Sequence, residues 1–424
     1  MKLRHLALAG ALLSAIGIYA AHAAGIFPGF PSVGNTTAQT PGPSYSIPMD
    51  TGIAGGVAPQ TVLVPAAVVG NYGGTPRNYL GNGALNITNS NGTSTVTCAQ
   101  NAAITTAALS ADRWGCIANV AVGAGRTAIV TSSPSPPAGF TNSMKVFRTS
   151  GALTQPVCVM QEVPTPQATF LAGQTVTFSV QATPLAGLAA DNGNVINLVI
   201  INGTGTDEGI NASPTASPAI TPAWTGINTV VNQPITLTTA ALTFARVFVT
   251  ATIPTNATEV GAMLCFTPTA TGAGATDGFA WTGAQLEISP SPSPFEFQRK
   301  SDENADAQRY FYKISEGGTA STTRAMCVAS TTSLLVCNLQ FPSTMYKVPT
   351  MSYTNGFAGC TTVACSALVA CTAIRTSTVI ATFGPNALTV PVDCTSGAGF
   401  AAAGSASMLA DNNGSGVINA WTGL

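Results

Sequence analysis

The sequence predicts an all-β protein, in which an extended N-terminal arm precedes a jelly-roll β-sandwich, a short helix and a second, smaller β-sandwich domain. Three observations support this prediction. Short segments of alternating apolar and polar residues fill the chain from residue 75 to residue 298, and TVTFSVQ (175–181) is the clearest of them. Clusters of Gly, Pro, Asn and Asp separate these segments. No stretch of a dozen residues in this region has the periodicity of an amphipathic helix.

The first 23 residues have the order of a secretory signal peptide. Two basic residues precede the apolar run Leu6–Ala20, and Ala-His-Ala at 21–23 fits the cleavage pattern. The run is short for a membrane span, so we expect cleavage after Ala23 rather than an uncleaved anchor. Because His5 and His22 are the only histidines in the sequence, the mature chain would contain no imidazole. This excludes Ser-His and Cys-His nucleophile mechanisms and histidine-ligated zinc.

Composition limits the partners and the location. Residues 24–74 are rich in Gly, Pro, Thr and Ser, which predicts an extended arm with one strand at TVLVPAAVV (61–69). Charged residues make up 7% of the chain and the net charge is −1. Nucleic acid is therefore not an expected partner, since binding phosphates requires clustered Lys and Arg. A wet surface made of uncharged polar residues suits an exported protein or a rigid assembled particle.

Ten cysteines in an oxidising compartment predict disulfides. The x4 and x5 spacings near the C-terminus do not give the paired C-x-x-C knuckles of structural zinc sites. We predict three pairs, Cys98–Cys116, Cys158–Cys265 and Cys327–Cys337. The pairing of the remaining four is left open by the sequence: Cys360, Cys365, Cys371 and Cys394.

The densest charge in the chain lies in PFEFQRKSDENADAQRYFYKI (294–314). Ser301 or Asp302 would cap a helix with acids in its first turn and Lys313 near its end. We therefore predict a connecting helix over residues 299–317 that joins two β-domains. Its apolar stripe at i, i+3, i+4 and i+7 would consist of Ala307, Tyr310, Phe311 and Ile314. The segment 318–424 returns to short strands and predicts the smaller, disulfide-rich β-domain.

Five segments together resemble the carbohydrate-binding-like jelly-roll module of bacteriophage tail-fibre and related virion proteins. Three features of the junction are the most specific, namely Gln285-Leu286-Glu287, Pro294-Phe295-Glu296 and Gln308-Arg309-Tyr310-Phe311. The segments are TPRNYLGNGALNI (75–87), ADRWG (111–115), KVFRTSG (145–151), LAGQTVTFSVQA (171–182) and the long junction 281–314.

The resemblance covers residues 75–314 and, more loosely, the rest. It implies a non-catalytic virion component, commonly trimeric, that contacts other virion proteins and presents its sandwich to host-surface glycans. A signal peptide and ten cysteines are features of an exported protein, so a secreted bacterial surface adhesin that uses the same module is the alternative.

Exposed aromatic rings are the natural candidates for stacking on sugars. Trp114 and Trp281 lie among apolar strand residues and are expected in the core, whereas Trp224 lies in the loop-like SPAITPAWTGIN and is the best candidate platform. Two turns flank VINLVIINGTG and would offer oxygen ligands to calcium if the strand between them bent back. Ordinary turn chemistry explains the same residues, so we expect no cofactor. The turn residues are Asp191, Asn192, Asn194, Asp207 and Glu208.

A polysaccharide-degrading enzyme is the third hypothesis. Such enzymes need two acids on opposite sides of the scissile bond. Asp207 and Glu208 are adjacent and would point to opposite faces of an extended chain. The other candidate acids occur singly, so the sequence does not predict an enzyme: they are Asp112, Glu162, Glu259, Asp277 and Glu287.

Overall fold

The computed structural model divides the 424-residue chain into two units, residues 1–75 and 76–424, each described by itself. In the first unit, strands β1 (Ser44–Pro48) and β2 (Thr61–Pro65) form an antiparallel pair. The predicted signal peptide and most of the predicted arm lie outside the described residues. The structure describes residues 44–48, 61–65, 78–100, 109–118, 126–148, 154–210, 222–269, 277–315, 323–354, 357–360, 368–374, 387–394, 406–411 and 417–422, apart from the single positions 91, 93, 239 and 348.

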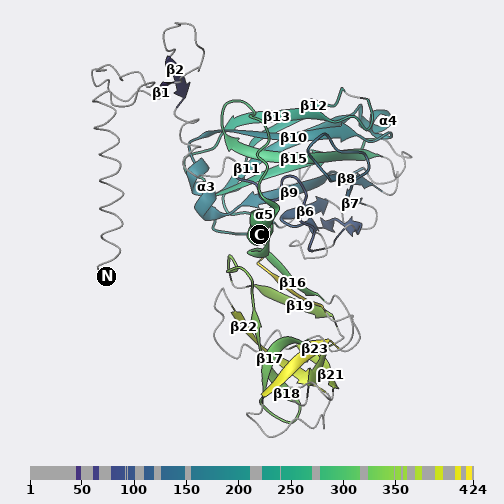
Figure 1. Ribbon diagram of the computed structural model, residues 1–424. Coiled ribbons are helices and arrows are strands. Elements are labelled where there is room, and N and C mark those ends of the chain that lie inside the picture. The colour runs from purple at the N-terminus through teal and green to yellow at the C-terminus, as the bar shows by residue number, and fades with distance from the viewer. Residues whose placement is uncertain are drawn as a thin grey trace, which may run out of the picture. The chain divides into compact units, whose positions relative to one another are not determined.

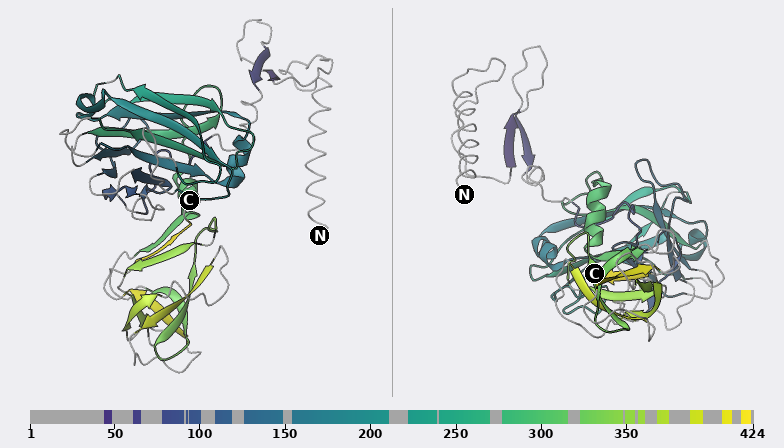
Figure 2. Two further views of the ribbon diagram at one scale, coloured as in Figure 1. Left: turned by 180° about the vertical axis from the view of Figure 1, so that it is seen from behind. Right: turned by 60° about the horizontal axis from the view of Figure 1, so that its bottom comes forward.

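Two sheets, antiparallel except for one short parallel pair, form a β-sandwich in the second unit, and the chain passes repeatedly from one sheet to the other (Figures 1 and 2). The all-β prediction is confirmed. The six-stranded sheet has the order β13 (Ala245–Thr252), β10 (Thr175–Pro184), β15 (Gly278–Ile288), β8 (Ser143–Arg148), β7 (Arg126–Thr131) and β3 (Val96–Thr97). The seven-stranded sheet has the order β12 (Asn228–Thr236), β11 (Val195–Gly203), β14 (Glu259–Phe266), β9 (Val157–Val163), β6 (Trp114–Ala118) and β4 (Ala99–Gln100), with β5 (Leu109–Ala111) paired to β6.

The core lies between the two sheets. The alternation read in 175–181 is confirmed, because Val176, Phe178 and Val180 are fully buried there. Trp114 and Trp281 are buried as expected, with ring centroids 4.6 Å apart in an edge-to-face arrangement. Two short helices, α3 (Thr165–Leu171) and α4 (Leu188–Asn192), connect strands. Among the described residues, no helix has the length and apolar composition of a membrane span.

Asn78 joins the beginning of the second unit to its last sandwich strand. Its Oδ1 accepts hydrogen bonds from the backbone N–H groups of Leu80 and Leu286, each 3.0 Å long. Its Nδ2 donates to the carbonyl oxygen of Ala284 at 3.0 Å. Asn78 is 5% exposed, so these bonds satisfy backbone groups that water does not reach. This explains structurally why the N-Y-L segment and the Q-L-E strand occur together.

The residues after β15 cross the outer face of the six-stranded sheet, and we call 289–297 the strap. Leu286 enters the core, so Gln285 and Glu287 face outward. Glu287 Oε1 accepts from the Ser293 N–H at 2.8 Å, and Gln285 Oε1 accepts from the Glu296 N–H at 2.8 Å. The Glu296 carboxylate in turn accepts from the Asn78 N–H at 2.8 Å. The polar residues of the junction motif thus fix the strap on the sandwich.

The charged segment after the strap is a helix followed by a strand. Helix α5 covers Lys300–Gln308, and residues 311–315, which we expected in the same helix over 299–317, form strand β16 (Figure 2). β16 pairs with β24 (Val417–Trp421), which also pairs with β19 (Thr350–Thr354). The aromatic and β-branched residues of FYKIS favour a strand, and their partner comes from the far end of the chain. We call these three strands the neck sheet.

The remaining strands pair in a ring of six, rather than in the two separate sheets of the predicted smaller sandwich. The ring closes because β17 hydrogen-bonds on one side to β18 and on the other to β23. A buried apolar cluster that includes Leu335, Leu339 and Val392 is their core. In ring order the strands are β17 (Thr323–Ala329), β18 (Leu334–Gln340), β22 (Ala387–Cys394), β21 (Leu368–Ile374), β20 (Phe357–Cys360) and β23 (Ala406–Asp411).

All three predicted disulfides are present, Cys98–Cys116, Cys158–Cys265 and Cys327–Cys337. A fourth, Cys371–Cys394, pairs two of the four cysteines that the sequence left open. The side chains of Cys360 and Cys365 lie outside the described residues. Cys158 and Cys265 are direct partners in the register of β9 and β14, so this disulfide fixes the alignment of two central strands.

Replacing Asn78 with Ala is expected to lower the free energy of unfolding by at least about 3 kcal/mol, because it leaves two buried N–H groups and one carbonyl unpaired, at about 1–3 kcal/mol each. Urea unfolding followed by tryptophan fluorescence measures the change. Asn256→Ala is the control, because Asn256 is exposed in a turn and its replacement should change the free energy of unfolding by less than about 0.5 kcal/mol. Equal stability of N78A and N256A would contradict the role given to Asn78.

Candidate functional site

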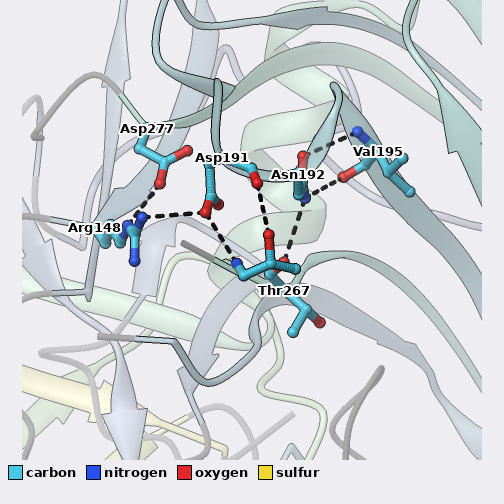
Figure 3. Close-up of polar contacts among 7 residues, drawn as sticks. Arg148, Asp191, Asn192, Val195, Thr267 and Asp277 are labelled. Atoms are coloured by element: carbon cyan, nitrogen blue, oxygen red, sulfur yellow. Dashed lines mark hydrogen bonds and ion pairs between the residues drawn. The ribbon is translucent and has the colours of Figure 1, made fainter. Parts of the chain in front are cut away.

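A buried ionic cluster lies where β8, α4 and the start of β15 meet (Figure 3). Arg148 Nε lies 2.6 Å from Asp277 Oδ2, and its Nη2 lies 3.3 Å from Asp191 Oδ1. All three side chains are fully buried. Burial, and secondarily the charge of Asp191, raises the pKa of Asp277 to about 6. One guanidinium therefore joins two carboxylates from segments far apart in the sequence.

The neighbouring turn has a structural role in this cluster. Asp191 also accepts from the Thr269 N–H at 2.9 Å. Asn192 closes the turn, because its Nδ2 donates to the Val195 carbonyl at 2.9 Å and its Oδ1 accepts from the Val195 N–H at 3.1 Å. Asn194 has a φ of 65°, the left-handed conformation that Asn tolerates in turns. Asp191, Asn192 and Asn194 are therefore explained by turn and ion-pair chemistry.

The two turns that we considered as a joint calcium site do not meet. Strand β11 runs for nine residues between them, which spans about 30 Å when extended. Asp207 and Glu208 lie beyond its far end, away from Asp191. Among the residues that the structure describes, no three His, Cys, Asp or Glu side chains are grouped so that they could hold a metal ion.

Trp224 is not the exposed platform that its loop-like context predicted. Its side chain is 4% exposed, and its Nε1 donates to the Gly209 carbonyl at 2.7 Å. The ring packs so closely over Gly261 that a Cβ there would lie 3.0 Å from it. Trp224 packs onto the outer face of the seven-stranded sheet, a tertiary contact that the local sequence pattern does not reveal.

That outer face is a second apolar centre, and the neck sheet packs against it. Phe311 of β16 is buried in this cluster, and Trp421 of β24 packs against it. We call this contact between the seven-stranded sheet and the neck sheet the joint. Its other buried members are Leu109, Ile117, Cys158, Met160, Val199, Ile201, Ile210, Trp224, Met263 and Cys265.

Two glutamates lie side by side at the edge of the joint. Glu162 is the last residue but one of β9 and lies opposite Gly261, which is two residues from Glu259 at the start of β14. The two side chains therefore share one face as diagonal neighbours, whose separation is roughly 7–8 Å. Glu162 is 1% exposed and Glu259 is 0% exposed. The sequence showed these acids singly, and only the pairing of β9 with β14 brings them together.

Burial favours the protonated form of both glutamates. Desolvation, and then the charge of Glu259, raises the pKa of Glu162 to about 8, although Arg113 acts in the opposite direction. Arg113 donates to the backbone carbonyl of Glu162 at 3.1 Å, rather than to its carboxyl group. Desolvation raises the pKa of Glu259 to about 7, and its Oε1 accepts from the Glu208 N–H at 2.6 Å.

Aromatic and basic residues from the C-terminal side complete the joint. Asp207 Oδ1 accepts from the Tyr346 hydroxyl at 3.2 Å, and the Asp207 carbonyl accepts from Lys347 Nζ at 3.1 Å. The Tyr346 ring stacks on Tyr310 with centroids 5.3 Å apart. The Arg113 guanidinium lies 3.5 Å from the Tyr310 ring centroid. Asp207, predicted as a ligand residue, therefore anchors the segment that leads into β19.

Glu208 has different hydrogen-bond partners from Asp207. Its carboxylate accepts from the Thr225 backbone N–H and from the Thr225 hydroxyl, the latter at 2.7 Å. This contact holds the loop that carries Trp224 over the sheet.

Three phenylalanines form an aromatic trio on the strap. The ring centroids of Phe140, Phe295 and Phe297 are 4.9–5.0 Å apart, and Phe297 is 55% exposed. Glycine at 139 is required, because its φ is 93° and a Cβ there would lie 3.2 Å from Phe297. The sequence reasoning considered only tryptophans. The F-E-F pattern around Glu296 was the available signal.

Comparisons with known proteins give structural likeness only. No family model and no curated protein matches the chain. Among solved structures, the enzymatically active domain of bacteriophage CBA120 tailspike protein 4 is 10% identical with a TM-score of 0.26, over 45% of this chain and 22% of that one. A putative sugar binding protein from Bacteroides thetaiotaomicron is 10% identical with a TM-score of 0.29, over 50% and 100% of the two chains. A CBM4 structure is 13% identical with a TM-score of 0.24, over 42% and 88%. Likenesses this low do not bear on the function.

Arg148→Met is expected to destabilise the protein by about 3–5 kcal/mol, because it leaves two buried carboxylates without their shared cation. The loss should become smaller as the pH falls toward about 6, because Asp277 without Arg148 takes up its proton at a higher pH than in the wild type, where its pKa is about 6. Urea unfolding at several pH values measures both effects. Arg299→Met removes an exposed arginine and should change stability by less than about 0.5 kcal/mol. Equal stabilities of R148M and R299M would contradict this assignment.

Proposed function

We propose that this chain is a non-catalytic structural protein of the phage tail-fibre kind, and that its β-sandwich binds host-surface glycans through the aromatic trio. The observation that supports the binding surface is the exposed Phe297 ring, packed against Phe140 and Phe295 in a chain with little surface charge. The apolar face of a pyranose ring stacks on such a surface, and polar groups around it orient the sugar. Gln298, Arg299 and Lys300 follow at once and are exposed.

The platform is rigid before any ligand arrives. The strap is held by Gln285, Glu287 and Glu296, whose hydrogen bonds link it to the sheet and to Asn78. A fixed platform loses less conformational entropy on binding than a flexible loop does. This favours a site at which weak contacts to individual sugars add up.

Disulfides support an exported or particle-bound protein. Four pairs are formed among the described residues, which suits an oxidising environment. The tail-fibre identity, the trimer and the contacts to other virion proteins rest on the sequence resemblance. A secreted adhesin is the alternative, and intact mass of the native protein separates the two. Loss of residues 1–23 favours the adhesin, whereas a full-length chain with free thiols favours assembly in the cytoplasm.

A polysaccharide-degrading enzyme is the second candidate function, and one observation favours it. Glu162 and Glu259 are neighbouring carboxyl groups, and a glycosidase uses two such groups, one protonated and one ionised, whereas here burial raises both pKa values, to about 8 and about 7. Their burial at the joint supports the non-catalytic proposal instead. Release of reducing ends from a glycan panel, abolished in E162Q, would establish the enzyme.

Phe297→Ala is expected to weaken glycan binding about tenfold, which corresponds to about 1.4 kcal/mol of lost stacking. The measurement is a glycan array to find the ligand, then isothermal titration of that glycan with wild type and variant. Phe170→Ala is the matched control, because Phe170 is 70% exposed but lies on α3 and outside the trio. F297A that binds as tightly as F170A would contradict the proposed platform.

A further inference from the structure

The joint combines an apolar centre with a rim rich in acids. Phe311 and Trp421 of the neck sheet pack on the outer face of the seven-stranded sheet. Around them, five carboxyl groups face three cationic groups and two tyrosines. Lys313 of β16 lies on the same face of its strand as Phe311. The sandwich contributes Arg113, Glu162, Asp207, Glu208 and Glu259, the end of α5 contributes Asp306, Arg309 and Tyr310, and the segment before β19 contributes Tyr346 and Lys347.

The three cations of the rim contact groups other than the carboxyl groups of the two buried glutamates. Arg113 donates to a backbone carbonyl and lies over the Tyr310 ring. Lys347 donates to the carbonyl of Asp207, and Arg309 Nη1 lies 4.0 Å from Asp306 at the surface. Neither oxygen of the Glu162 carboxyl group has a hydrogen-bond partner among the described residues. An ionised Glu162 would therefore be a buried charge without a hydrogen-bond partner among these residues, and the nearby charge of Arg113 offsets its burial only in part, so its ionisation is costly.

We propose that the joint is a proton-controlled latch, closed while Glu162 and Glu259 carry protons and opened when they ionise, so that the neck sheet and the six-stranded ring can move relative to the sandwich. Opening lets water hydrate both carboxylates. It separates Tyr346 and Lys347 from Asp207, since these bonds cross the joint. The proposal concerns how the sandwich is oriented, and it does not depend on the proposed glycan platform.

The direction of the pH dependence follows from linkage. In the closed joint the pKa of Glu162 is raised from 4.5 to about 8 and that of Glu259 from 4.5 to about 7. The closed form therefore binds these protons more tightly than a hydrated, open form. The stability of closure is full below about pH 4.5 and is lost as the pH rises toward about 8.

Two tryptophans report on opening of the joint, because Trp224 is buried in it and Trp421 packs against it. The other two, Trp114 and Trp281, belong to the sandwich core. Acrylamide quenching of the full chain is measured from about pH 5.5 to 8.5. We expect the quenching constant of wild type to rise about twofold over this range, with unchanged far-ultraviolet circular dichroism. E162Q/E259Q should remain closed and show no rise, because Gln resembles the protonated acid. Asp302→Asn removes an exposed acid of α5 and should behave as wild type.

Three results would overturn the latch. They are a flat wild-type curve, a rise of equal size in E162Q/E259Q, and loss of the rise in D302N. If the double variant does not fold, Tyr346→Phe gives the second test. It removes the hydroxyl group that binds Asp207 and should move opening to lower pH, so a Y346F curve that superimposes on wild type also contradicts the proposal. No glycan is present in these measurements, so failure of glycan binding leaves their outcome unchanged.

Discussion

The alignment of β9 with β14, fixed by the Cys158–Cys265 disulfide, is the constraint on which the arrangement of the joint depends. Both strands are buried along their whole length, because the other sheet covers one face and the joint covers the other. A slip of β9 by one residue would turn every side chain of that strand to the opposite face. It would move Met160 into the sandwich core and separate Glu162 from Glu259 and the neck sheet. The disulfide therefore determines which side chains of the two strands face the joint, in addition to stabilising the strands.

Features encoded locally were predictable from the sequence. Alternation located strands such as β10, and adjacent small loops and apolar strands suggested the three disulfides. The acid pair was within reach of the same reasoning. Once Cys158 is placed opposite Cys265 in antiparallel strands, counting four residues forward and four back puts Glu162 opposite Gly261, next to Glu259. Two single acids on separate strands form no sequence motif, so only their positions in the strand register show that they are neighbours.

Other features depend on partners remote in sequence, and local pattern cannot supply them. The residues of β16 fit a helical stripe as well as a strand, and only pairing with β24 decides between the two. Trp224 looks exposed because it lies in a loop-like stretch, yet its ring lies over Gly261 of a distant strand. Arg148 gave no signal, since its two carboxylate partners come from separate turns. In each case tertiary contact overrides what the nearby residues favour.

The junction that stood out by its charge links both proposed functions along one stretch of chain. Its first part, the strap, carries Phe295 and Phe297 and is fixed to the sheet through Gln285 and Glu287. Helix α5 follows, nine residues or about 13 Å long, and ends directly before Tyr310. The Tyr310 ring contacts Arg113 on the sandwich side of the joint and Tyr346 on the other. Because the strap is fixed at several points, movement at the joint would be taken up beyond α5 rather than at the aromatic trio. The binding face would then keep its geometry while the orientation of the C-terminal strands changes with pH.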